Sequence, residues 1–134
     1  MSQVLARAGS RPAFGQRLLA VGVIALARLL ATLPPRRIRQ VLGLLRRGSV
    51  PANYAQASLA RDTITAVSVR CSGRYCLQRA LATAILCRIR GSWPRWCAGV
   101  RGTAPFASHS WIEADGRPVG ESASVAGYHI IMSV

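Results

Sequence analysis

The stretch GRYCLQRALATAILCRIRG, residues 73–91, decides the fold because it combines a long, largely apolar run with two cysteines. The run predicts a buried helix over about residues 75–90, and Gly91 is expected to close it. Cys76 falls in the first turn of that helix, and Cys87 falls near its end. The two thiols lie on nearly the same helical face, so periodicity alone does not rank them.

Helix position separates the two cysteines. A helix N-terminus and nearby cations both favour the thiolate, which is the form that attacks carbonyl groups. Cys76 has both, because Arg74 and Arg79 are its neighbours. Cys87 has apolar neighbours and is interpreted as a core residue. Cys76 is therefore the candidate nucleophile, with simple packing as the alternative.

The other two cysteines are interpreted as structural. Cys97 lies inside an expected strand beside Trp96, and Cys71 ends an expected helix, where nothing lowers a thiol pKa. The cysteine spacings match no zinc motif, so we expect neither a metal nor a cofactor. No export signal is recognisable, which favours a cytoplasmic protein with reduced thiols.

The chain before residue 73 is predicted to be helical. Residues 1–12 are polar and basic and are expected to be flexible. Helices are expected over 16–33, from Pro35 to just before Gly48, and over about 52–70.

The first of these helices is apolar enough to raise the question of a membrane span. Arg17 begins it, Arg28 interrupts it and Pro34 ends it, and a spanning helix needs about 20 apolar residues. A helix that is buried or docked on the protein surface is therefore favoured.

The chain after residue 91 changes to strand patterns. Strands are expected over 94–101, 108–114, 117–122 and 128–134, with Asp115-Gly116 as a hairpin turn. The whole chain, 1–134, is predicted to be a single α+β domain. It would consist of a helical part, 16–72, followed by the candidate catalytic helix and a small antiparallel sheet, 73–134.

The charge is strongly positive, because all 18 basic residues are arginine and only four residues are acidic, giving a formal net charge of +14. Such a surface attracts nucleic acid, anionic lipid or an acidic peptide. A non-enzymatic protein that binds nucleic acid or a membrane surface is therefore an alternative. The arginines are scattered and no nucleic-acid-binding motif is recognisable, so we expect no nucleic acid partner, while peripheral membrane contact is kept open.

A thiolate nucleophile needs a base and an orienting partner. His109 is the better base because it opens a strand just after a loop, whereas His129 is interpreted as a partly buried strand residue. Among the acids, Glu113 lies about 13 Å from His109 along one strand, and Asp115 is expected in the turn.

Glu121 is the remaining acid near the expected hairpin, and its position depends on the turn. A two-residue loop pairs Ser110 with Glu121 and puts the acid on the face opposite His109. A three-residue loop pairs Trp111 with Glu121 and brings the acid within side-chain reach of His109. The sequence permits both registers, so the Cys76, His109 and Glu121 set depends on which is adopted.

Two blocks resemble a known family: C-L-x-R-A-L at 76–81 and H-x-W-x-E-x-D-G-R-P-V-G-E at 109–121. Together with WPRWCAGVR at 93–101, they are similar to the leader peptidases of lasso-peptide biosynthesis in their split form, over about residues 30–122. These are small cysteine proteases with a transglutaminase-like, papain-like core. The resemblance implies Cys76 as nucleophile, His109 as base and Glu121, where the family often has aspartate, as the residue that orients His109.

The resemblance also implies a reaction and partners. The enzyme would remove the leader from a ribosomally made precursor and free the core peptide's amine for macrolactam formation by a separate cyclase. Its implied partners are the precursor, a small leader-recognition protein and the cyclase. An alternative within the same fold is a transglutaminase-type acyl transferase, in which an amine replaces water.

Overall fold

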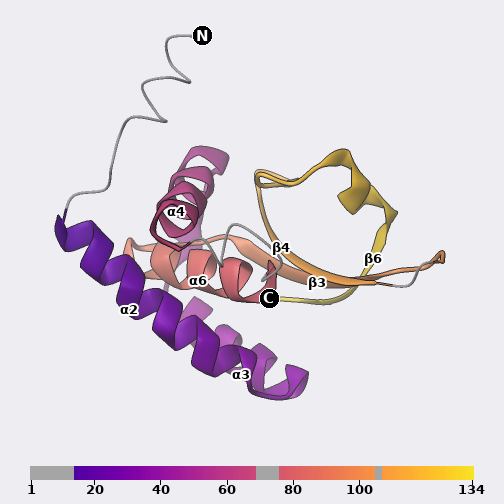
Figure 1. Cartoon of the computed structure of the whole chain (residues 1–134), viewed down its shortest axis with the longest axis horizontal. Helices are drawn as coiled ribbons and strands as arrows, with labels where there is room; N and C mark the ends of the chain where they lie inside the picture. Colours follow the sequence, from indigo (N-terminus) through magenta and orange to yellow (C-terminus); the bar gives the residue numbers. More distant parts are fainter. Residues whose placement is uncertain (1–13, 69–75, 105–106) are drawn as a thin grey trace, which may run out of the picture.

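The computed structural model describes residues 14–68, 76–104 and 107–134 and combines helices with a small antiparallel sheet (Figure 1). The elements in chain order are α2 (Phe14–Ala31), α3 (Pro35–Arg46), β1 (Val50–Pro51), α4 (Tyr54–Val67), α6 (Cys76–Ile89), β2 (Ser92–Trp93), β3 (Arg95–Arg101), β4 (Ser108–Ala114), β5 (Arg117–Pro118), the 3-10 helix η1 (Ala123–Gly127) and β6 (Tyr128–Ser133). The α+β prediction is confirmed.

Helix α6 lies at the centre of the molecule (Figure 1). Every residue from Arg79 to Cys87 is buried, because α2 and α4 pack against this helix and the sheet covers it through β4. A helix that is apolar around most of its circumference is stable only in such a position. It ends as predicted, since Gly91 has a positive φ of 94° and its N–H bonds to the Arg88 carbonyl.

The main sheet has four antiparallel strands in the order β5-β4-β3-β6. Three of the predicted strands are confirmed closely, whereas the strand predicted over 117–122 is reduced to β5, Arg117–Pro118. A second sheet, the short parallel pair β1 and β2, was not predicted. Two-residue strands carry too little alternation to be recognised from sequence.

The helix boundaries follow local capping. Helix α3 begins at Pro35, as predicted, and Gly48 follows its end with a φ of 76°. Helix α4 begins at Tyr54, because Asn53 and Gln56 form a reciprocal capping box. It ends at Val67, so the predicted range of 52–70 was too long. The expected flexibility of 1–12 lies outside the described residues.

Helix α2 packs on the protein along one face, which agrees with the prediction of a docked helix. Its buried residues pack against α6 and α4. By length and composition alone the helix could cross a membrane. Its outer face exposes several large apolar side chains: Phe14, Leu18, Leu19, Val21, Leu26 and Leu29.

Candidate active site

Cys76 is the first residue of α6, and its half-buried thiol contacts the side chain of His109. The hydrogen bond with His109 is the largest influence that lowers the Cys76 pKa below its usual value. The backbone of Ser110 and the charges of His109 and Arg79 act in the same direction, and partial burial opposes them. The thiol predicted to be reactive from its helix position therefore lies where a thiolate is favoured.

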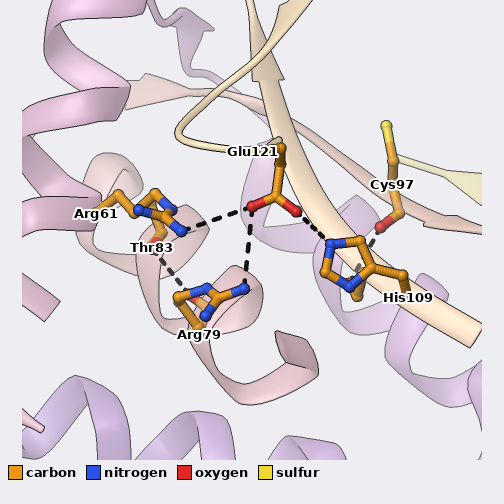
Figure 2. Close-up of polar contacts among 7 residues, drawn as sticks. Arg61, Arg79, Thr83, Cys97, His109 and Glu121 are labelled. Atoms are coloured by element: carbon orange, nitrogen blue, oxygen red, sulfur yellow. Dashed lines mark hydrogen bonds and ion pairs between the residues drawn. The ribbon is translucent and has the colours of Figure 1, made fainter. Parts of the chain in front are cut away.

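His109 lies on β4, between the thiol and a carboxylate. Its Nε2 hydrogen-bonds to Oε1 of Glu121 (Figure 2), which leaves Nδ1 as the ring nitrogen available to Cys76. The hydrogen bonds with Cys76 and then Glu121 raise the pKa of His109 to about 9, although burial opposes them. The lowered Cys76 pKa and the raised His109 pKa both favour a thiolate–imidazolium pair over the neutral pair.

Glu121 is nearly buried, with 8% of its side chain exposed, and it faces three cationic or ionisable partners. Figure 2 shows its carboxylate between His109 on one side and the guanidinium groups of Arg61 and Arg79 on the other. Burial alone would raise the Glu121 pKa, but the hydrogen bond to His109 and the charges of His109 and both arginines outweigh it and lower the pKa. The carboxylate is therefore held in its charged form.

The hairpin register corrects one expectation. The turn is the two-residue loop Asp115-Gly116, because Ala114 pairs with Arg117 and both turn residues have positive φ. This register was expected to keep Glu121 away from His109, and that expectation is wrong.

The expectation failed because it continued the strand ladder as far as Glu121. The last ladder contact is the bond from the Val119 N–H to the Ile112 carbonyl. Gly120 then adopts a φ of 67°, which turns the chain out of the ladder. Glu121 therefore approaches His109 from outside the strand pairing.

Two aromatic rings pack against the imidazole. Trp111 is stacked with His109 at 5.7 Å between ring centroids, and Tyr128 of β6 is tilted against it at 5.6 Å. Gly99 opposite His109 makes this packing feasible, because a Cβ there would lie 2.9 Å from the Trp111 ring and 2.7 Å from the His129 carbonyl oxygen. The sheet thus fixes the ring plane of His109.

The other sequence candidates lie outside this cluster. Cys87 and Cys97 are buried as predicted, and burial raises their pKa values to about 11 and about 12. Glu113 pairs with Arg95 and accepts a hydrogen bond from Trp111, so it reaches His109 only through the Trp111 ring. Asp115 occupies the turn, as expected.

Two further sequence interpretations can be compared with the structure. His129 lies on β6, as expected for a strand residue, but it is exposed, so its predicted burial was wrong. The interpretation of Cys71 lies outside the described residues.

Sequence reasoning missed Arg61 and Tyr128 as members of the site. Arg61 is a helical residue far from the motif blocks, and Tyr128 begins the last strand. No sequence signal distinguishes either from an ordinary surface residue, because their positions depend on how α4 and β6 pack. Arg79 was noted only as a cation near Cys76.

A cavity of about 410 Å³ lies elsewhere, beside Trp93, Glu113 and the C-terminal Val134, and it includes none of Cys76, His109 and Glu121. We place the candidate site at the thiol–imidazole contact, because reactivity depends on these groups rather than on cavity size. Within the described ranges no group of three or more potential ligand side chains could hold a metal ion.

A thiol beside an imidazole that hydrogen-bonds in turn to a carboxylate is the arrangement of cysteine-dependent acyl transfer. The family model described as the transglutaminase-like superfamily matches residues 20–133 of the chain. The chain belongs to the transglutaminase-like superfamily, whose fold is typical of cysteine peptidases and acyl transferases. No curated protein and no solved structure matches the chain.

Proposed function

We propose that the protein is a cysteine peptidase that removes the leader from a lasso-peptide precursor. The observation that carries the proposal is the contact sequence from the Cys76 thiol to His109 and from His109 to Glu121. The two motif blocks that resemble split leader peptidases contribute all three of these residues. The superfamily match supports a cysteine-dependent enzyme, and the resemblance supplies the substrate.

The proposed reaction begins with attack of the Cys76 thiolate on the carbonyl carbon at the leader–core junction. The first-turn N–H groups of α6 have no partner within the helix, so the backbone N–H of Cys76 can donate to the oxyanion. The imidazolium of His109 then protonates the departing amine, which becomes the N-terminus of the core peptide. Neutral His109 takes a proton from water, and the resulting attack releases the leader and restores the thiolate.

Glu121 has two roles in the proposed reaction. It orients the ring so that Nδ1 faces the thiol, and its negative charge stabilises the imidazolium. Glutamate serves here in place of the aspartate that is common in the family.

The proposed partners are the precursor, a separate leader-recognition protein and the cyclase. The exposed arginines offer a surface for an acidic leader: Arg36, Arg37, Arg39, Arg46 and Arg47 on and after α3 are exposed together. If this attraction contributes to binding, the affinity for the leader falls as salt increases. Affinity that is indifferent to ionic strength would remove the charge argument and leave the chemistry untouched.

Intact-mass analysis of precursor incubated with the enzyme and a candidate leader-recognition protein tests the proposal. Hydrolysis gives two fragments whose summed mass exceeds the precursor by one water. An acyl transferase supplied with a primary amine would instead give a product carrying that amine. If neither product forms when the cognate precursor and partner are present, the proposal is contradicted.

A further inference from the structure

We propose that Arg61 of α4 is a positioning residue that holds Glu121 against His109. The inference rests on the proposed function, because it assigns Arg61 a role through Glu121 as the residue that orients the base. Glu121 leaves the strand ladder and yet reaches the imidazole of His109, and a contact with Arg61 would explain why.

The first support is steric. A Cβ on Gly120 would lie 2.6 Å from Nη1, 2.7 Å from Cζ and 2.8 Å from Nε of Arg61. The guanidinium therefore occupies the space beside the Gly120 backbone that any other residue would fill. Gly120 thus has two reasons to be glycine, since its φ of 67° also disfavours side chains.

The second support is that the two oxygens of the Glu121 carboxylate have different partners. Nη2 of Arg61 lies 3.6 Å from Oε2 of Glu121, and Nη2 of Arg79 lies 3.9 Å from the same oxygen. The other oxygen, Oε1, bonds to His109. Because both cations attract Oε2, the carboxylate is turned so that Oε1 faces the ring (Figure 2).

The two arginines differ in what else they touch. Arg79 lies on the same helix as Cys76, and its charge acts directly on the thiol. Arg61 comes from α4, contacts the Gly120 backbone position, and is not one of the leading influences on the Cys76 pKa. Removing Arg61 therefore perturbs the thiol through Glu121 and His109, which makes it the cleaner test.

The ionisable groups around Glu121 come from several elements and all bear on that test. The groups that act on Glu121 itself are His109 from β4, Arg79 from α6 and Arg61 from α4. Arg61 in turn is influenced by Asp62 and Tyr54 on its own helix as well as by Arg79, and His109 also contacts Cys76 and Tyr128. Only Arg61 and Arg79 face the Oε2 side of the carboxylate in the described part of the chain.

The experiment is the rate of Cys76 alkylation by iodoacetamide against pH, with the modified cysteine located by peptide mass spectrometry. The wild-type profile is expected to have a low-pH inflection, where the thiolate–imidazolium pair forms, and a second one near pH 9, where His109 loses its proton. In Arg61→Met the upper inflection should fall by about one pH unit, because Glu121 no longer holds the ring.

A double variant separates positioning from general destabilisation. If Arg61 acts through Glu121, then Arg61→Met should shift the upper inflection in the wild type but not in Glu121→Gln. Arg61→Lys, which keeps the charge but loses the planar fork, should retain part of the wild-type profile. Gly120→Ala should displace the guanidinium and shift the profile in the same direction.

Arg88→Met is the matched control. Arg88 is also half-buried, but its side chain bonds to the carbonyls of Leu45 and Arg47, away from the site. This variant should lower the melting temperature without moving the upper inflection.

An unchanged inflection in Arg61→Met, or an equal shift in the Glu121→Gln background, would overturn the inference. If Arg61→Met does not fold, Arg61→Lys and Gly120→Ala are judged by the same profile. Alkylation needs no substrate, so a failure to cleave precursor with the predicted shift intact would count against the proposed function alone. If cleavage requires Cys76 but Arg61→Met does not move the upper inflection, only the role of Arg61 is contradicted.

Discussion

Nε2 of His109 bonds to Oε1 of Glu121 although the register of β4 and β5 would carry residue 121 to the opposite face of the sheet. The contact exists because the ladder stops after Val119 and the chain turns at Gly120. Because strand pairing does not hold Glu121, the position of its carboxylate depends on the neighbouring side chains of Arg61 and Arg79. The pH behaviour of the site should therefore depend on this contact as well as on the contact between Cys76 and His109.

The alkaline limit of cleavage should lie near pH 9. In the proposed mechanism cleavage requires the thiolate of Cys76 and the imidazolium of His109 together, and the imidazolium is lost as pH rises through the His109 pKa of about 9. Glu121→Gln removes one of the two hydrogen-bonded partners that raise this pKa. The alkaline limb should then move to lower pH, with plateau cleavage slower by about tenfold or more.

Glu113→Gln is the control for that experiment. Glu113 lies on the same strand as His109, pairs with Arg95 and accepts a hydrogen bond from Trp111 Nε1, which the amide oxygen of glutamine can also accept. It should leave the alkaline limb of the kcat/KM profile in place, and a shift equal to that of Glu121→Gln would contradict the assignment of Glu121.

Among the cysteines of the described ranges, Cys76 should react selectively at neutral pH. Its pKa is lowered by the contact with His109, whereas burial raises the pKa values of Cys87 and Cys97 to about 11 and about 12. A short pulse of iodoacetamide on the native protein, followed by peptide mapping, should label Cys76 before either of the others. Equal labelling of Cys87 would show that its position in α6 is not as described.

Gly99→Ala should damage the site through the sheet. The added Cβ would meet the His129 carbonyl oxygen at 2.7 Å, and backbone on the neighbouring strand cannot move aside easily. We expect a loss of about 1–3 kcal/mol in the free energy of unfolding, measured in urea, together with slower cleavage as Trp111 shifts from His109.

Gly22→Ala provides the opposite control, because nothing lies within 4 Å of a Cβ there and the residue is in helix α2. It should stabilise the protein by about 1 kcal/mol. Equal stability changes for the two glycines would contradict the close packing of β3 against β6.

The sequence was informative where one residue determines a local structure. Pro35, Gly91 and the Asp115-Gly116 turn fixed element ends, and helix position ranked Cys76 above Cys87, in agreement with their different pKa directions. It was uninformative where a contact depends on packing between distant elements. Arg61 reaches Gly120 across 59 positions of the chain, and no local pattern encodes that approach.

The register of the hairpin shows the same limit in a different way. The structure adopts one of the two registers that the sequence permits. The inference from register to function failed because it assumed that β5 continues as far as Glu121. A glycine at position 120 was the available signal that the ladder could end there.

The most direct test of the central claim is cleavage of the precursor by Cys76→Ala, compared with wild type and with Cys87→Ala. Each protein is incubated with precursor and a leader-recognition partner, and the leader fragment is quantified by mass. Cys76→Ala should release no leader, while Cys87→Ala should release it at a rate close to wild type once the two are matched for folded protein. Leader release by Cys76→Ala at the wild-type rate would show that Cys76 is not the nucleophile.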